Sequence, residues 1–442
     1  MFGKSGIALA FSMIGVGALI AAPQTAAAQE LTNIAQNETG DTAWILMSSA
    51  LVLLMTLPGL ALFYGGMVRA KNFLSVMLQV AAVAGLASVL WVVVGYTLAF
   101  GDSVGGVIGD GEKWMLIGSK MDILREGMTL PESTFALFQM TFAAITPALM
   151  VGAWVDRARF GWVLAFTAIW GLLVYAPVAH WIWGGGWLGQ MGVTDFAGGL
   201  VVHTTAGVSA LVIALLLGKR QGFPSSALLP HAPGMTMLGA MLLWVGWFGF
   251  NGGSALTATD DASSAIISTH VAAAVAALTW LLIEKIKFGK ATNVGFATGA
   301  IAGLATITPA AGYVAPGAAI LLGIAGSTVC YGAITLVKNR WSIDDSLDVF
   351  AVHGVGGILG SVLLGIFMSA DLGGTGYAEG AGMAAMLGTQ AIGIAVVALF
   401  SAIVTALVAV GVSLFIPMRV SEDEEVEGLD QTSHGERAWH FD

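Results

Sequence analysis

Charged residues are scarce in this sequence. Only 10% of its 442 residues are Asp, Glu, Lys or Arg, whereas 57% are hydrophobic. A soluble domain carries about 25% charged residues, so this composition excludes a soluble globular fold and is typical of a membrane protein. The net charge of −10 comes without any basic tract, which argues against nucleic-acid binding.

Cysteine is nearly absent as well. The single cysteine, Cys330, lies within an apolar run, so the chain can form neither an intramolecular disulfide nor a thiolate metal site. Such a residue is most simply a small buried hydrophobic side chain. Glycine, by contrast, is abundant, with 60 residues. It allows helices to pack backbone to backbone in lipid, where no hydrophobic force drives their association.

Apolar runs long enough to span a bilayer, which takes about 20 residues, recur along the chain. We expect eleven transmembrane helices and therefore an all-α polytopic membrane protein. The predicted spans cover residues 43–66, 73–100, 133–154, 161–183, 197–218, 235–256, 262–284, 292–310, 314–337, 349–369 and 385–417. The last is long enough to tilt or to extend beyond the bilayer.

The two ends of the chain differ from the rest in composition. Residues 1–28 are predicted to be a cleavable signal peptide, with Lys4, an apolar stretch and an A-x-A site that ends at Ala28, after which cleavage is expected; an uncleaved first helix is the alternative. Residues 29–417 then form the membrane domain. Residues 418–442 are polar and acidic, and they are either a disordered, solvated tail or a cytoplasmic segment that docks for regulation.

The distribution of Lys and Arg predicts the orientation of the chain. With the N-terminus outside and eleven spans, thirteen of these residues lie in cytoplasmic segments, whereas only Lys113, Lys120 and Arg125 lie outside. Cytoplasmic loops of membrane proteins carry the excess of positive charge. We therefore expect an external N-terminus, a cytoplasmic C-terminus and insertion in a bacterial inner membrane.

A short pattern occurs twice. The segments DFAGGLVVHTTAG, from Asp195, and DSLDVFAVHGVGG, from Asp345, both read D-x6-V-H-x3-G. The first lies on the fifth span and the second on the tenth, and these spans run in opposite directions. Matched features on oppositely directed helices are typical of an inverted repeat, here five spans plus five with one extra helix, whose sites lie near the membrane midplane. We therefore expect His203 and His353 to meet there.

Several roles are open to two such histidines. A metal site is disfavoured because two ligands are too few. A proton relay, a hydrogen-bonded neutral pair lining a narrow pore, and two unrelated buried histidines stay open. The aspartates Asp195 and Asp345 are expected to cap helix starts, with contact to a substrate as the alternative.

Aromatic residues gather near one membrane face in the predicted topology. Phe138 and Phe142 lie one turn apart in the third span, and Trp247, Phe250 and Ser254 lie close together in the sixth. Trp183 ends the fourth span. Such residues often form an interfacial belt. Because Trp183 and Ser254 share the outer mouth, the alternative is a cation site, since a Trp face attracts cations and a hydroxyl oxygen accepts hydrogen bonds.

These motifs resemble those of the ammonium transporter, methylammonium permease and Rhesus family. The resemblance covers all eleven spans and the tail, and it is carried by DFAGGLVVH, DVFAVHGVGG, FNGGS, ITPAAGYVAP and GLDQTSHGE. It implies a homotrimer with one pore in each subunit, no enzymatic activity, no cofactor and no resident metal. It also implies a tail that meets a PII-type nitrogen regulatory protein.

The resemblance implies a role for each candidate residue. Trp183, Phe142 and Ser254 resemble the outer ammonium site, surrounded by Phe138 and Trp247. Phe142 and Phe250 resemble a stacked gate, and His203 and His353 resemble the twin histidines of the pore. Asp195 resembles an aspartate needed near the outer site, Asp345 is its counterpart in the repeat, and Thr308 resembles a polar residue near the pore mouth.

The expected activity is transport of ammonium, with methylammonium as an analogue. A bare ammonium ion costs tens of kcal/mol to bury in an apolar medium, so we expect the cation to bind outside, to lose a proton and to cross as ammonia. Two alternatives remain. One is an ammonium sensor on the same fold that signals through the tail, and the other is a secondary transporter for amino acids, which would favour broken helices around a larger polar cavity.

Overall fold

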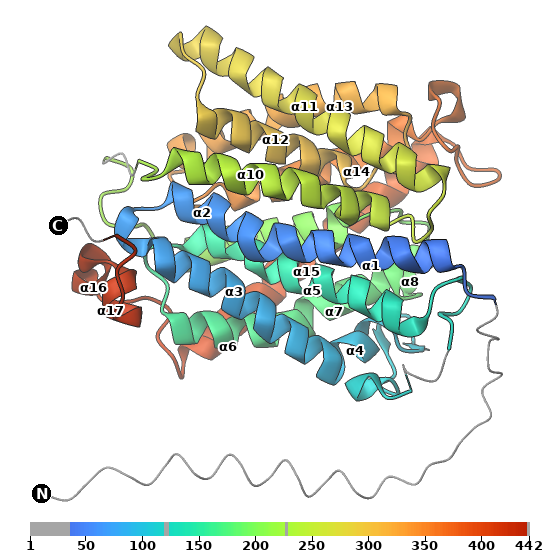
Figure 1. Cartoon of the computed structure of the whole chain (residues 1–442), viewed down its shortest axis with the longest axis horizontal. Coiled ribbons are helices and arrows are strands. Elements are labelled where there is room, and N and C mark those ends of the chain that lie inside the picture. Colours follow the sequence, from blue (N-terminus) through green and yellow to red (C-terminus); the bar gives the residue numbers. More distant parts are fainter. Residues whose placement is uncertain (1–35, 119–122, 226–228, 440–442) are drawn as a thin grey trace, which may run out of the picture.

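The computed structural model describes residues 36–118, 123–225 and 229–439, which form a bundle of helices (Figure 1). In this part of the chain ten helices are long and apolar enough to cross a membrane, and the shorter apolar helix α12 (Asn293–Ile307) corresponds to the predicted span 292–310. The prediction of an all-α membrane protein with eleven helices is confirmed. The predicted signal peptide, residues 1–28, lies outside the described residues.

Many spans consist of several helical segments in succession. In chain order the segments of the bundle are α1 (Thr39–Leu54), η2 (Met55–Leu60), α2 (Ala61–Met67), α3 (Phe73–Leu90), η4 (Trp91–Gly95), α4 (Tyr96–Phe100), α5 (Glu132–Trp154), α6 (Phe160–Trp170), η6 (Gly171–Tyr175), α7 (Ala176–Trp183), α8 (Trp187–Gln190), η7 (Gly199–Thr204), α9 (Thr205–Leu217), α10 (Pro233–Trp247), η8 (Phe248–Gly252), α11 (Asp260–Phe288), α12, α13 (Pro316–Ile334), η9 (Thr335–Arg340), η10 (Phe350–Gly354), α14 (Val355–Phe367) and α15 (Met383–Ser413).

The remaining elements are short. They are the 3-10 turns η3 (Ala70–Asn72), η5 (Trp114–Leu116) and η11 (Ala370–Leu372), the antiparallel strands β1 (Ser103–Val104) and β2 (Ile108–Gly109), and the tail helices α16 (Glu422–Glu427) and α17 (Leu429–His434). The strands and η5 lie in the connection between α4 and α5.

Several segments of the bundle are π-helical: η2, η4, η6, η7, η8, η9 and η10. A π-helical turn holds an extra residue, which re-aims the neighbouring side chains, and such turns are frequent at functional sites. In η2 the cause is visible in the sequence, because Pro58 has no N–H to donate to the preceding turn. His203 lies in η7, His353 in η10 and Phe250 in η8.

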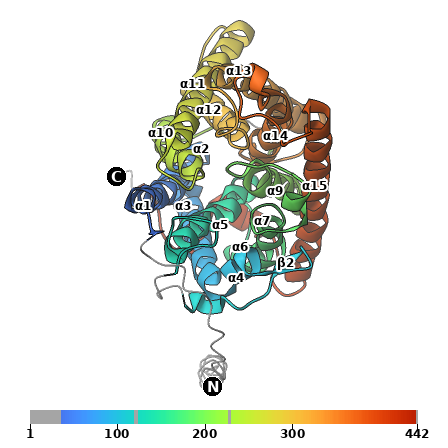
Figure 2. The same ribbon diagram turned by 90° about the vertical axis from the view of Figure 1, so that its right-hand side faces the viewer.

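Helix α5 lies in the interior of the bundle, where almost all of its residues are buried, and it packs against α1, α3 and α9. On one side of the bundle α10, α11, α12 and α13 pack together (Figures 1 and 2). The long helix α15 lies along the outside, against α6, α9 and α14, and Figure 2 shows it at one edge. This arrangement leaves α5, η7, η8 and η10 to surround the centre.

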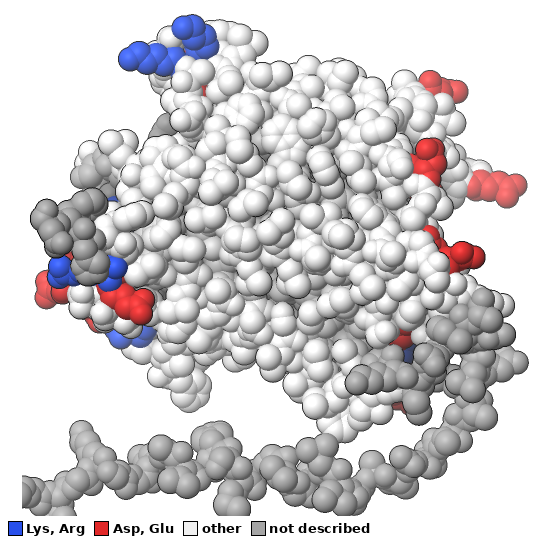
Figure 3. Space-filling model, viewed as in Figure 1, with Lys and Arg blue, Asp and Glu red and all other residues white. Residues whose placement is uncertain are grey.

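Charged residues gather at the two ends of the face shown in Figure 3, and the band between them is uncharged. Helix α11 illustrates the pattern, since it begins with Asp260 and Asp261 and carries Lys285 and Lys287 in its last turn. An uncharged band between charged ends is what a bilayer requires of a protein that spans it.

A glycine pair lets the two matched segments cross closely. A Cβ atom at Gly207 of α9 would overlap the backbone of Gly354 in η10. Only glycine permits this approach, which brings the turn that carries His203 against the turn that carries His353.

The described part of the tail packs against the bundle of its own chain. The carboxylate of Asp430 in α17 accepts hydrogen bonds from the backbone N–H groups of Leu74 (3.1 Å) and Ser75 (2.7 Å) at the start of α3. The carboxylate of Glu425 in α16 accepts the backbone N–H of Gln221 at 2.7 Å. These bonds fix the tail at one end of the bundle, which we name the tail end.

Candidate functional site

A cavity of about 460 Å³ opens at the end of the bundle opposite the tail, and we name it the vestibule. Its wall includes Phe142 of α5, Trp183 of α7, Asp195, and Ser254 after η8. Four residues that the sequence predicts to lie near one membrane face therefore do line one cavity. The indole N–H of Trp183 donates to the carbonyl oxygen of Asp195 at 2.8 Å, which fixes the ring in the wall.

Two stacked phenylalanines close the inner end of the vestibule. The rings of Phe142 and Phe250 lie 4.4 Å apart between centroids, with an interplanar angle of 36°. The Trp183 ring meets the Phe142 ring edge-on, with 5.7 Å between centroids. The ring of Phe138, one turn earlier in α5, also meets Phe142 edge-on, at 5.0 Å. Both stacked phenylalanines are fully buried. They form a step between the vestibule and the interior, and Phe138 supports this step from behind without lining the vestibule.

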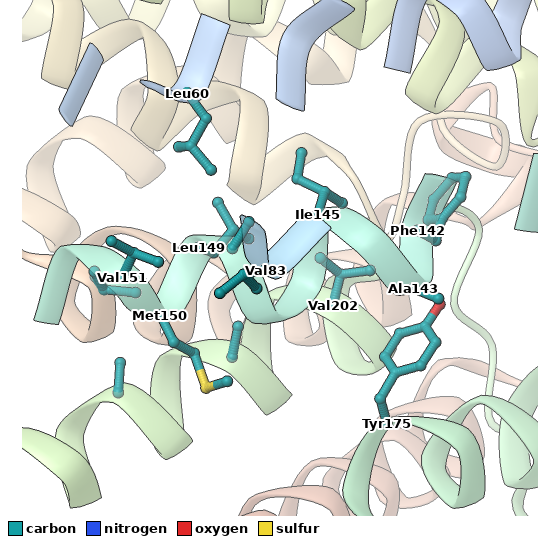
Figure 4. Close-up of a cluster of buried hydrophobic side chains, with 14 of the residues drawn as sticks. Leu60, Val83, Phe142, Ala143, Ile145, Leu149, Met150, Val151, Tyr175 and Val202 are labelled. Atoms are coloured by element: carbon teal, nitrogen blue, oxygen red, sulfur yellow. The ribbon is translucent and has the colours of Figure 1, made fainter. Parts of the chain in front are cut away.

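A second, enclosed cavity lies beyond the phenylalanine step, and with the side chains as they stand it is too narrow to admit a water molecule. His203 and His353 line it, together with Trp247, Phe250 and a set of aliphatic residues, Met55, Leu60, Ile145, Leu149, Val202, Leu243 and Ile301. Figure 4 shows Ile145 and Leu149 of α5 on the side that faces Leu60, while Met150 and Tyr175 lie on the other side. The cavity is therefore apolar except for the two imidazoles and the indole.

The two histidines contact each other. Their Nδ1 atoms are 3.3 Å apart, and their rings lie at 22° with 5.3 Å between centroids. His203 also stacks on Trp247 (5.4 Å) and on Phe250 (6.0 Å), so one column of rings runs from the step to His353. At this distance one imidazole donates a hydrogen bond to the other, which requires the donor on one ring and the acceptor on the other.

The cap before His203 is complete. The carboxylate of Asp195 accepts four backbone N–H groups, those of Gly198, Gly199, Leu200 and Val201, at 2.7 to 3.0 Å. Gly198 adopts a left-handed backbone (φ 114°), which turns the chain around the carboxylate. Burial raises the pKa of Asp195 and the four N–H groups oppose this effect. The carboxylate orients η7, and all of its hydrogen-bonding capacity is used inside the protein.

The turn before His353 is built differently. One carboxylate oxygen of Asp345 accepts a hydrogen bond from the backbone N–H of Phe350 at 2.7 Å. The other oxygen has no hydrogen-bond partner among the described residues. Burial and then the neighbouring charge of Asp348 raise the pKa of Asp345 to about 7. Asp348 in turn pairs with Lys338 at 2.8 Å.

A buried charged cluster holds this turn at the tail end. The guanidinium of Arg220 donates to both oxygens of Asp344 (2.8 and 2.9 Å) and pairs with Asp156 at 3.0 Å. Arg157 donates to the hydroxyl of Ser346 at 2.6 Å. These bonds connect the ends of α5 and α9 to the segment that precedes η10. The position of His353 in η10 therefore depends on both helix ends and on that segment.

Like Phe138, two further residues that the sequence predicts for the outer site do not line the vestibule. Trp247 lines the enclosed cavity beside His203, beyond the phenylalanine step. Thr308 is fully buried behind it, where its hydroxyl accepts the indole N–H of Trp247 at 2.9 Å and donates to the carbonyl oxygen of Leu304. Thr308 thus orients the indole and does not line either cavity.

Sequence reasoning missed other residues of the vestibule wall, namely Gln139, Asp261, Tyr313 and Thr375. Only Gln139 carried a usable signal, because it is a polar residue in an apolar span, three residues before Phe142 and so on the same face of α5. In the part of the chain that the structure describes, no group of three His, Cys, Asp or Glu residues is placed to hold a metal ion.

Comparisons with known proteins agree on one family. The sequence pattern of the Ammonium Transporter Family matches residues 43–439. The ammonium transporter of Bacillus subtilis (strain 168) is 47% identical over 405 residues, which cover 91% of this chain and 99% of the relative.

Solved structures give the same result. The crystal structure of Saccharomyces cerevisiae Mep2 superposes with a TM-score of 0.81 at 38% identity, covering 88% of this chain and 90% of that one. A structure described as a sensor Amt protein superposes with a TM-score of 0.83 at 30% identity, covering 90% of this chain and 98% of that one.

Proposed function

Because the chain belongs to the ammonium transporter family and transports ammonium across a membrane, we propose that the vestibule binds the cation and that ammonia crosses the enclosed cavity past the histidine pair. The observation that carries this proposal is the contact of His203 with His353 at 3.3 Å in an otherwise apolar cavity, directly beyond the stacked phenylalanines.

The cation binds among Trp183, Phe142 and Ser254. Aromatic faces attract cations, with about 2 kcal/mol for a desolvated ion. The hydroxyl of Ser254 donates to the carbonyl oxygen of Phe250 at 2.8 Å, so its oxygen keeps lone pairs that accept an N–H of ammonium. Asp195 contributes its negative charge at a distance, because its carboxylate is occupied by backbone N–H groups.

The ammonium ion cannot cross the apolar interior unless polar groups of the protein replace its hydration shell. Transfer of an isolated ammonium ion to a medium of low dielectric constant costs tens of kcal/mol by a Born estimate. The enclosed cavity offers aliphatic side chains, five aromatic or imidazole rings and no carboxylate. Ammonium therefore loses a proton near Phe142 and Phe250, and neutral ammonia crosses. Potassium is excluded because it has no proton to lose.

The histidine pair gives ammonia its polar partners at mid-depth. A neutral imidazole that accepts a hydrogen bond from its neighbour still carries a free ring nitrogen. The Nε2 atom of His203 is buried without a partner among the described residues, so it is placed to bond a passing ammonia molecule. A proton relay along the two rings is the second role that this arrangement allows, and it would make uptake electrogenic.

The setting of the transporter is also part of the proposal. We propose a bacterial inner membrane, with the vestibule outside and the tail end in the cytoplasm, because Lys and Arg of the predicted inner loops such as Lys285, Lys287 and Arg220 lie toward the tail end. We further propose a homotrimer with one pore in each subunit. Docking of residues 418–439 on the tail end supports a regulatory face there, for which a PII-type regulatory protein is the proposed partner.

The test is uptake of labelled methylammonium into proteoliposomes with simultaneous measurement of current. We expect saturable uptake that potassium does not inhibit. A current proportional to uptake would show that the proton released by the cation also crosses, along the histidine pair. Uptake without current would show that this proton stays outside. Absence of uptake by intact, folded protein would overturn the pore mechanism.

Sensing is a second candidate function, and the similarity to a sensor Amt protein favours it. A sensor would signal through residues 418–442. This segment is short for a signalling domain, and its described part packs against its own bundle. Binding of ammonium that alters the tail without any uptake would favour sensing over transport.

A further inference from the structure

Gln139 is the one carboxamide in the wall of the vestibule as described, and its surroundings are unusual. It lies on α5 next to Phe138 and three residues before Phe142, and it is only 7% exposed. Its carboxamide oxygen is buried without a hydrogen-bond partner among the described residues. Buried polar side chains in native proteins are nearly always hydrogen-bonded, so an unpaired one calls for a partner that comes from outside the chain.

The other polar groups at the inner end of the vestibule are already committed. The carboxylate of Asp195 is taken by four backbone N–H groups, and the indole N–H of Trp183 is taken by a backbone carbonyl. The hydroxyl hydrogen of Ser254 is taken by Phe250. The oxygen of Ser254 and the carboxamide oxygen of Gln139 therefore remain as acceptors near Phe142 and Trp183, and Asp261, Tyr313 and Thr375 add further oxygen atoms to the wall.

We propose that Gln139 is a specificity-determining residue of the ammonium site, whose carboxamide oxygen accepts an N–H of the cation. The inference rests on the proposed function of the vestibule and adds a residue to it. A half-turn about the last side-chain bond exchanges the oxygen and nitrogen of a carboxamide, and this bond rotates easily. As placed, the oxygen is buried, and the half-turn brings it to face the cavity without any movement of α5.

The arrangement suits the number of hydrogens on the ligand. Ammonium has four N–H groups, and the inner vestibule offers two oxygen acceptors, from Gln139 and Ser254, and two ring faces, from Phe142 and Trp183. A metal cation such as potassium has no hydrogens to donate and needs more oxygen ligands than two. Gln139 thereby favours ammonium over potassium at the binding step, before any proton is lost.

The test compares three variants of the full chain in proteoliposomes, with labelled methylammonium uptake measured over a range of concentrations. Gln139→Leu keeps the approximate volume and removes the acceptor, so we expect KM to rise about tenfold with a maximal rate close to the wild type. Gln139→Glu keeps an acceptor and adds a negative charge, so we expect KM to fall below that of the wild type. Gln190→Leu makes the same change at an exposed residue of α8 and should leave KM unchanged.

Ser254→Ala, measured in parallel, separates this inference from the function on which it rests. A raised KM in both Gln139→Leu and Ser254→Ala supports the inference. A wild-type KM in Gln139→Leu beside a raised KM in Ser254→Ala overturns it and leaves the vestibule site standing. A wild-type KM in both variants overturns the vestibule site itself. Thermal unfolding of each purified variant checks that a raised KM does not come from loss of folded protein.

Discussion

Asp195 and Asp345 precede the paired histidines His203 and His353 by the same eight residues, yet their carboxylates have different surroundings. Asp195 accepts four backbone N–H groups, whereas Asp345 accepts the N–H of Phe350 and leaves one oxygen unpaired among the described residues. The same residue type at the same spacing thus forms a saturated helix cap in one segment and a poorly satisfied carboxyl group in the other.

The difference follows from what surrounds each turn. Gly198 and Gly199 let the chain fold tightly around Asp195, since the first of them has a left-handed backbone. At the tail end the corresponding residues are Asp348 and Val349, and Asp348 has a positive φ of 62° despite its side chain. A second carboxylate therefore lies beside Asp345, where the other segment has only backbone N–H groups. The two segments share their spacing, but the polar groups of each fit its own end of the bundle.

The histidines differ in the same way. His203 stacks on Trp247 and on Phe250, and so it continues the aromatic column from the vestibule. His353 has one ring contact among the described residues, with His203. The aromatic column therefore reaches His203 from the vestibule and ends at His353.

The largest effect is expected from removal of the saturated cap. Asp195→Ala leaves four buried N–H groups without an acceptor, and each unpaired buried group costs about 1–3 kcal/mol. We expect a loss of more than about 3 kcal/mol in unfolding free energy, well beyond the ~1 kcal/mol of an ordinary helix cap. Thermal unfolding in detergent measures this loss. Asp345→Ala, the matched control, should destabilise far less; equal destabilisation by both substitutions would contradict the comparison.

An intermediate effect is expected at the histidine pair. His203→Ala removes a ring from the aromatic column as well as the hydrogen bond to His353, so we expect methylammonium uptake to fall at least about tenfold, with potassium no longer excluded. His353→Ala keeps the column and should impair exclusion less. Uptake and potassium conductance in proteoliposomes distinguish the two variants. His270, which contacts Trp244 and Phe248 on the outside of the bundle, supplies the control His270→Ala, with uptake unchanged.

Much of this architecture can be predicted from the sequence because lipid imposes simple rules. Long apolar runs locate the spans, and the repeated D-x6-V-H-x3-G pattern correctly predicts that His203 and His353 meet. The grouping of Trp183, Phe142 and Ser254 around one cavity also follows from the predicted topology.

Other features depend on contacts that no local pattern encodes. The π-helical turns that carry Phe250 and both histidines contain no proline that would reveal them in the sequence, unlike η2 with its Pro58. The position of Thr308 behind Trp247 and the unpaired oxygen of Gln139 likewise depend on which residues of other helices lie next to them.

The sharpest test of the contrast between the aspartates is the pH dependence of stability. In the folded protein the pKa of Asp345 is raised to about 7, chiefly by burial and then by Asp348, although Lys338 opposes this. The folded state therefore holds a proton that the unfolded chain releases near pH 4, so stability falls as the pH rises between these values. The slope approaches about 1.4 kcal/mol per pH unit from this group alone. Asp345→Asn mimics the protonated carboxyl at every pH, and its unfolding temperature should vary less between pH 4 and 7 than that of the wild type. An unchanged slope in this variant would show that Asp345 is ionised throughout and that the two caps are alike after all.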